Sequence, residues 1–173
     1  MADSLSRSVY GSELLEKIPG VNILLYNELK DYRHLEDLLR KHPMNIILYQ
    51  TNQKGSSAYG HWVALFRTPS GSVEFFDSYG TYPDDDLART IYKDCKECNY
   101  LTKLLLDFMD RGGSVEYNNY KLQGDSTATC GKHVFTRLLN SGLGIDQYKS
   151  YLDEMKKLYG SYDKVVHEIY NLY

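Results

Sequence analysis

Two apolar runs separated by a short turn most strongly limit the folds open to this chain. Residues 62–67 (Trp-Val-Ala-Leu-Phe-Arg) and 72–77 (Ser-Val-Glu-Phe-Phe-Asp) are rich in β-branched and aromatic side chains. Between them, Pro69 and Gly71 supply turn geometry. The pattern therefore predicts an antiparallel hairpin. Residues 44–50 (Met-Asn-Ile-Ile-Leu-Tyr-Gln) predict a further buried strand before it.

Helical periodicity lies on both sides of this strand-forming region. Apolar residues at helical spacing predict helices over 28–41, 84–95, 101–109, 130–139, 147–158 and 163–172. Residues 51–58 are polar and contain Gly and Ser, so they predict a loop. After the break at Gly112 and Gly113, residues 114–122 predict a weak strand. Grouped strands with helices before and after them predict an α+β layered fold.

The length and charge of the chain narrow its class. With 173 residues, of which 42% are hydrophobic, the chain can close one sizeable core, and we expect a single domain over 1–173. The net charge of −3 gives no overall attraction to nucleic acid or to an anionic membrane. The first residues do not resemble a secretory signal, and no apolar run approaches the length of a membrane span. We therefore expect no membrane partner.

The cysteines indicate a reducing compartment. Cys95, Cys98 and Cys130 are too few and too unevenly spaced for the disulfide framework of a secreted scaffold. The first two resemble half of a zinc knuckle, but a tetrahedral site needs a second ligand pair, and none stands at suitable spacing. We therefore expect no metal. Cys95 and Cys98 are interpreted as surface or half-buried thiols, with a redox role as the alternative.

The third cysteine occupies a position suited to a reactive thiol. Cys130 opens the helix predicted over 130–139, directly after the polar loop 124–129. Unpaired N–H groups and the positive end of the helix dipole stabilise a thiolate at such a position. Gly131 beside it allows other backbone to approach closely. Cys130 is therefore either a nucleophile or an ordinary buried cysteine at a helix start.

Three polar residues near predicted strand ends complete a possible catalytic set. His61 begins one strand of the predicted hairpin and Asp77 ends the other, so the hairpin brings them together. A carboxylate there fixes the tautomer of the imidazole and stabilises its charged form. Gln123 follows the weak strand and can direct an amide N–H at the negative oxygen of a tetrahedral intermediate. Each is an ordinary residue alone, but with Cys130 they predict a thiol hydrolase.

Two further polar features are weaker candidates. His133 lies one helical turn after Cys130 and is either a rival base or a packed or solvated helix histidine. The acidic run 84–86 follows Pro83 and suits a helix start, where negative charge is favourable. Calcium binding is the alternative interpretation of that run.

Three segments of the middle of the chain, in this order, resemble the adenovirus-type maturation cysteine endopeptidases. They are residues 60–66 (Gly-His-Trp-Val-Ala-Leu-Phe), 75–80 (Phe-Phe-Asp-Ser-Tyr-Gly) and 123–131 (Gln-Gly-Asp-Ser-Thr-Ala-Thr-Cys-Gly). The same pattern is similar to the ubiquitin-like-protein proteases, which share the fold. The order His, Asp, Gln, Cys differs from that of papain-like enzymes in which the cysteine comes first.

The resemblance implies a papain-like-superfamily fold of the adenain type, with a central mixed sheet flanked by helices. It implies Cys130 as nucleophile, His61 as base, Asp77 as the orienting carboxylate and Gln123 as oxyanion donor. Trp62 is expected to pack beside the histidine. The length of the chain favours the viral branch, including the proteases of virophages and related DNA viruses.

The activity implied by the resemblance is the cleavage of capsid or other virion precursor proteins after small residues such as glycine. The expected location is the virion and the infected-cell cytoplasm. The adenoviral enzyme uses a peptide cofactor and DNA, but no residues here carry over either site, so neither is implied and no cofactor is expected. The alternatives are an isopeptidase acting on ubiquitin-like modifiers, an acyltransferase and an inactive virion interaction module.

Overall fold

The sheet at the centre of the molecule is mixed, and its strands follow their order in the sequence. The computed structural model describes residues 5–54 and 57–173. The five strands are β1 (Asn22–Leu25), β2 (Met44–Lys54), β3 (Ser57–Arg67), β4 (Val73–Phe76) and β5 (Val115–Tyr117). The outer pairs β1–β2 and β4–β5 are parallel, whereas β2–β3 and β3–β4 are antiparallel.

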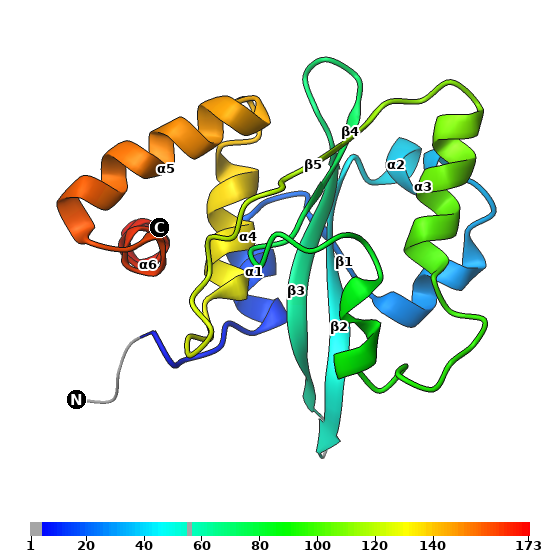
Figure 1. Ribbon diagram of the computed structural model, residues 1–173, viewed down its shortest axis with the longest axis horizontal. Coiled ribbons are helices and arrows are strands. Elements are labelled where there is room, and N and C mark those ends of the chain that lie inside the picture. Colours follow the sequence, from blue (N-terminus) through cyan, green and yellow to red (C-terminus); the bar gives the residue numbers. More distant parts are fainter. Residues whose placement is uncertain (1–4, 55–56) are drawn as a thin grey trace.

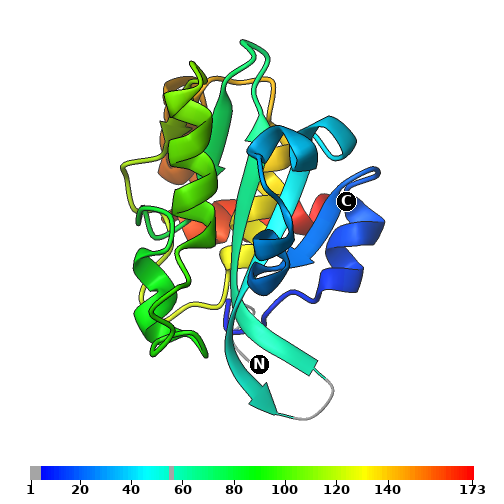
Figure 2. The ribbon, with the colours of Figure 1, turned by 90° about the vertical axis from the view of Figure 1, so that its right-hand side faces the viewer.

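Helices cover both faces of this sheet, which gives a layered α+β architecture (Figures 1 and 2). One face carries α1 (Gly11–Lys17), α4 (Cys130–Leu139), α5 (Ile145–Tyr159) and α6 (Tyr162–Leu172). The other carries the 3-10 helix η1 (Tyr26–Asp31), α2 (Leu35–Lys41) and α3 (Tyr100–Asp110). A second 3-10 helix, η2 (Asp85–Arg89), lies against β2. In the described part of the chain, no helix combines the length and apolar character that a membrane span requires.

The side chains of β3 alternate between two hydrophobic cores. Trp62, Ala64 and Phe66 belong to the core beneath α4, α5 and α6, whereas Val63 and Leu65 belong to the core beneath α2 and α3. This alternation is the period of an extended strand that is covered on both faces. Both cores therefore fix the position of β3. His61 lies in this strand, directly before its apolar run.

The predicted hairpin is confirmed as β3 paired with β4, with Ala64 opposite Phe76. Gly71 adopts a left-handed φ of 87°, and the N–H of Thr68 donates to the carbonyl of Ser72 at 2.9 Å. The helices predicted over 101–109, 130–139, 147–158 and 163–172 are confirmed as α3, α4, α5 and α6. The α+β class is therefore confirmed.

Two predictions in the first third of the chain were wrong in detail. The helix over 28–41 is divided into η1 and α2, because Tyr32 is extended and the Asp37 carboxylate caps a new helix by accepting the N–H of His34 at 3.2 Å. The loop over 51–58 is instead largely strand, since β2 continues to Lys54 and β3 begins at Ser57. Residues 55–56 lie outside the described residues. Cross-strand pairing overrides the polar composition there.

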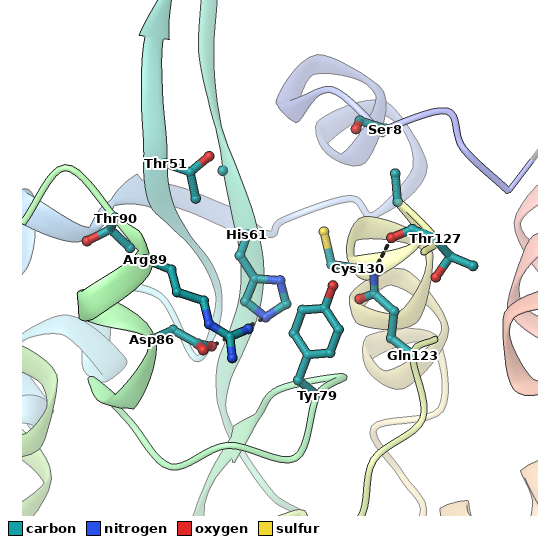
Figure 3. A pocket seen from close by; sticks show the side chains of 12 residues that line it. Ser8, Thr51, His61, Tyr79, Asp86, Arg89, Thr90, Gln123, Thr127 and Cys130 are labelled. Carbon is teal, nitrogen blue, oxygen red and sulfur yellow. Dashed lines mark hydrogen bonds and ion pairs between the residues drawn. The ribbon is translucent and has the colours of Figure 1, made fainter. Parts of the chain in front are cut away.

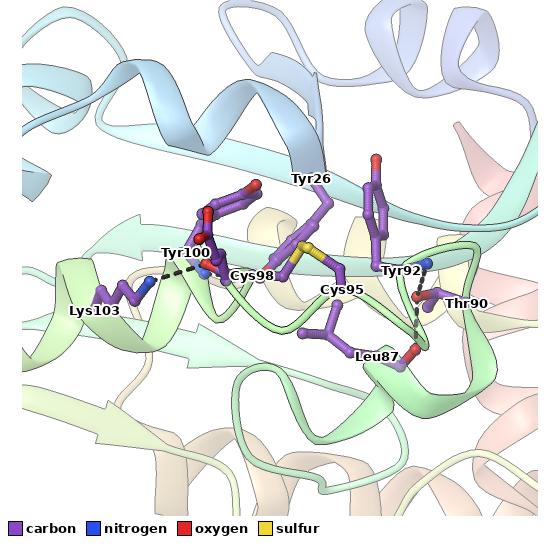
Figure 4. The surroundings of a disulfide bond; sticks show 9 residues. Tyr26, Leu87, Thr90, Tyr92, Cys95, Cys98, Tyr100 and Lys103 are labelled. Atoms are coloured by element: carbon purple, nitrogen blue, oxygen red, sulfur yellow. Dashed lines mark hydrogen bonds between the residues drawn. A yellow bond between two sulfur atoms is a disulfide. The ribbon is translucent and has the colours of Figure 1, made fainter.

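The region after β4 also differs from its prediction. The helix over 84–95 ends at Arg89, because Thr90 turns the chain by donating its hydroxyl to the carbonyl of Leu87 at 2.8 Å. Cys95 and Cys98 are joined by a disulfide, so they are not the separate thiols that were expected (Figure 4). Cys98 is buried, whereas Cys95 is exposed. The strand over 114–122 is shortened to β5.

Candidate active site

Cys130 is the first residue of α4, as predicted, and its sulfur faces a pocket (Figure 3). Its side chain is half-buried. A Cβ placed at the following Gly131 would lie 2.9 Å from Cβ of Val9 and 3.2 Å from Cδ1 of Trp62. The helix start can therefore pack this closely against its neighbours only because residue 131 is glycine.

A histidine and a carboxylate lie beside the thiol. His61, in β3, places Nε2 at 2.8 Å from Oδ1 of Asp77, which directly follows β4. The same oxygen accepts the N–H of Tyr79 at 2.8 Å, and Oδ2 accepts the hydroxyl of Thr81 at 2.5 Å. Because Asp77 engages Nε2, Nδ1 is the ring nitrogen left to face Cys130, whose sulfur helps to raise the pKa of His61.

The electrostatics of these three groups favour their charged forms. Burial raises the pKa of the Cys130 thiol, but the interaction with the neighbouring His61 outweighs burial and holds the pKa below its usual value. Burial lowers the pKa of His61, but Asp77 and Cys130 together raise it to about 10. Burial raises the pKa of Asp77, but His61 brings it below its usual range. These shifts favour a thiolate, an imidazolium and a carboxylate at the site.

The charge state of the thiol gives a direct test of this geometry. We expect His61→Ala to slow alkylation of Cys130 by iodoacetamide at about pH 6.5, by up to about 100-fold, because a thiol with a pKa of ~8.5 is only about 1% ionised there. The difference in alkylation rate should shrink as the pH rises, because above the ordinary thiol pKa Cys130 is ionised with or without His61. The measurement is the alkylation rate by mass spectrometry across the pH range.

His34 supplies the matched control for this measurement. Its Nδ1 also lies near a carboxylate, 2.9 Å from Asp107, but His34 does not line the pocket of Cys130. His34→Ala should therefore be alkylated like the unsubstituted chain. Equal rates for His61→Ala and the unsubstituted chain at the lower pH would contradict the thiolate–imidazolium pair.

The amide of Gln123 is held at both ends. Oε1 accepts the hydroxyl of Ser78 at 2.7 Å, and Nε2 donates to the carbonyl of Thr127 at 2.9 Å. The bond from Ser78 fixes the amide so that its nitrogen lies on the side of Cys130 (Figure 3). Nε2 carries a second hydrogen, which the Thr127 carbonyl does not use. That hydrogen is the donor available to an oxyanion beside Cys130.

The loop between Gln123 and Cys130 is anchored by Asp163, near the start of α6. Its carboxylate accepts the N–H of Gly124 at 2.9 Å, approaches Nε2 of His133 at 3.0 Å and accepts the hydroxyl of Thr129. Burial lowers the pKa of His133, which is fully buried and absent from the described lining of the pocket. The interpretation of His133 as a packed helix residue is therefore confirmed, and Asp163 is a positioning residue that the sequence did not reveal.

Asn118 and Tyr79 are further residues of the site that sequence reasoning missed. The Asn118 side chain accepts the N–H of Asp77 at 2.9 Å and donates to its carbonyl at 2.5 Å. Tyr79 stacks on His61 with ring centroids 4.9 Å apart. Trp62 was expected beside the histidine, but its ring packs towards Gly131 and its Nε1 donates to the carbonyl of Val9 at 3.0 Å. Asn118 lies in no motif of the sequence, and Tyr79 lies within the segment 75–80 but was given no role.

Asp86, from the acidic run 84–86, brings a second carboxylate to the histidine. Its Oδ2 lies 4.0 Å from Nε2 of His61 and accepts the hydroxyl of Thr81 at 3.0 Å. Burial and the charge of Asp77 raise the pKa of Asp86. His61, Asp77 and Asp86 place possible ligand atoms within 4.8 Å of one another, so they are the group best placed to hold a cation. Because His61 and Asp77 already form a hydrogen bond with each other, we infer that the two carboxylates orient the imidazole of His61 instead of holding a cation.

These residues surround a pocket of about 280 Å³. Figure 3 shows His61, Asp86 and Arg89 on one side of the pocket and Gln123 and Thr127 on the other, with the Cys130 sulfur between them. The structure thus brings Cys130, His61 and Gln123 around one space, with Asp77 behind the imidazole.

Fold and site together define a mixed α+β protein in which a cysteine at a helix start faces a histidine–aspartate pair. No family model matches the chain. Over 155 residues, the chain is 33% identical to Uncharacterized protein V9 of Sputnik virophage, covering 85% of this chain and 84% of that protein. The chain therefore belongs to the family of this virophage protein. The relationship supports a viral origin.

Proposed function

We propose that the chain is a cysteine endopeptidase with the adenain-type fold that its sequence resembles, and that it cleaves virion precursor proteins after small residues such as glycine. The observation that carries this proposal is the convergence of Cys130, His61 and Gln123 on one pocket, with Asp77 bonded to the imidazole at 2.8 Å. A nucleophile, a base with its orienting group and an oxyanion donor are the components that acyl transfer requires.

In the acylation step, the Cys130 thiolate attacks the scissile carbonyl carbon and forms a C–S bond. The electron pair of the carbonyl moves onto oxygen, where Nε2 of Gln123 and the N–H of Cys130 stabilise it. His61 donates its Nδ1 proton to the leaving amine as the C–N bond breaks. The products are a free amine and a thioester on Cys130.

In the deacylation step, neutral His61 removes a proton from water, and the resulting hydroxide attacks the thioester carbonyl. The same two donors stabilise the second oxyanion, and breaking of the C–S bond returns the thiolate. His61 then regains its imidazolium form beside Asp77, which raises its pKa. The raised pKa explains how the histidine keeps a proton for the leaving amine at neutral pH.

Two considerations support the proposal that the substrates are virion proteins. The resemblance to maturation endopeptidases implies capsid precursors, and the virophage relative supports a viral origin. The preference for small residues also rests on the resemblance. Ser8 lines the pocket on the side away from His61 (Figure 3), and Ala128 is a further small side chain in its lining.

The test is to incubate the purified chain with separately expressed precursor proteins of virus particles and to map new N-termini by mass spectrometry. We expect cuts that follow glycine or another small residue, and none after alkylation with iodoacetamide. Release of ubiquitin-like modifiers from lysine, without cuts in precursor proteins, would replace the proposal with the isopeptidase alternative. Absence of any hydrolysis, with an unreactive Cys130, would favour the interaction module.

A further inference from the structure

Arg89 is the only Lys or Arg among the described residues that line the pocket. It is the last residue of η2, its side chain is exposed, and it makes no hydrogen bond or ion pair in the described part of the chain. Figure 3 shows its guanidinium beside Asp86 and His61, on the opposite side of the pocket from Gln123. An unpaired guanidinium at the mouth of a reactive pocket is a ready donor for a carboxylate.

Two carboxylates, those of Asp86 and Asp125, lie near Arg89, but neither pairs with its guanidinium. Asp86 lies in contact with His61 and Thr81, and burial raises its pKa, which disfavours its negative form. Asp125 forms a hydrogen bond with Lys121, which is the main cause of its lowered pKa, and the charge of Arg89 is a minor contribution. The guanidinium therefore keeps its donors for a group that enters the pocket.

The chemistry of the site determines which part of a bound peptide substrate lies near Arg89. The scissile carbonyl must lie at the Cys130 sulfur with its oxygen towards Gln123. The leaving amine must lie at the imidazole of His61, which protonates it. The peptide that follows the scissile bond consequently leaves the pocket on the side of His61, where Arg89 and Asp86 lie (Figure 3).

From this arrangement we propose that Arg89 selects peptides with an acidic side chain, Asp or Glu, just after the scissile bond. This inference rests on the proposed peptidase function and names a feature of its substrates. A bidentate bond between the planar guanidinium and a carboxylate supplies both attraction and direction. A free C-terminal carboxylate offers the same chemistry, so the experiment separates the two sources.

The experiment compares amidated, fluorogenic peptides that differ only at the position after the cut, which is Glu, Gln or Lys. With the unsubstituted chain, we expect kcat/KM for Glu to exceed that for Gln about tenfold, and the ratio to fall as salt is added. In Arg89→Gln the ratio should fall close to one. In Arg89→Glu the Lys peptide should become the preferred one. Arg40→Gln, an exposed arginine of α2 outside the pocket, should keep the original ratio.

Equal cleavage of the three amidated peptides by the unsubstituted chain would overturn the inference about Arg89 and leave the peptidase proposal standing. A preference seen only when the Gln peptide carries a free C-terminus would also overturn it, because the carboxylate would then be terminal. Hydrolysis of none of the peptides, together with a Cys130 that resists alkylation, would instead count against the proposed function itself.

Discussion

Cys130→Ala should reduce peptide hydrolysis to background, a fall of at least about 10⁴-fold in kcat, because no other group at the site can form the thioester. The thiol stands at the start of α4 with its pKa below the usual value. The measurement is turnover of the preferred fluorogenic peptide, accompanied by circular dichroism to show that the variant is folded. The substitution removes only the sulfur atom, so little change in the stability of the fold is expected.

The other two cysteines supply the matched control. Cys95 and Cys98 bond each other and do not line the pocket. The double variant Cys95→Ser/Cys98→Ser should therefore retain most of the activity while losing the disulfide. Substantial turnover by Cys130→Ala, or its loss in the double variant with a native fold, would remove Cys130 from the role of nucleophile.

Gln123→Ala should lower kcat by about 100- to 1000-fold and change KM little, because an oxyanion donor acts mainly on the charged intermediate. Its Nε2 is held on the side of Cys130 by the bonds of the amide to Ser78 and Thr127. Alkylation of Cys130 by iodoacetamide should persist, since the thiolate depends on His61 and not on Gln123. Steady-state kinetics with parallel alkylation rates check both parts.

A glutamine elsewhere on the chain provides the comparison. Gln147 accepts the N–H of Gly144 at 2.9 Å at the start of α5, on the exposed surface. Gln147→Ala should therefore keep the kcat and KM of the unsubstituted chain. Near-normal kcat in folded Gln123→Ala would show that another group stabilises the oxyanion, and the role of the loop before Cys130 would have to be reassigned.

The parts of the site that depend on local structure were predictable from the sequence. His61 and Asp77 belong to adjoining strands joined by a tight turn, and Cys130 opens a helix whose periodicity is clear. The residues that orient them were not predictable. Asn118 bonds Asp77 across 41 positions, and Asp163 bonds Gly124 across 39. Such contacts depend on the packing of whole elements, which single-sequence patterns do not contain.

Two errors in the fold prediction have similar physical causes. Residues 51–54 have the composition of a loop, but backbone pairing with β3 extends the strand. Cys95 and Cys98 lie outside any helix, in the segment after η2, and there they form a disulfide with Cα atoms 5.5 Å apart. Both features depend on the backbone conformation, about which composition and cysteine counting give no information.

The dependence of the loop on Asp163 orders events during synthesis on the ribosome. The strands and α4 are made before α6, yet the turn that leads into Cys130 is fastened by a carboxylate of α6. A nascent chain from which Asp163 has not yet emerged therefore lacks the two bonds of this carboxylate to Gly124 and Thr129. The thiol can therefore reach its finished surroundings only once α6 has been made and has packed against this loop.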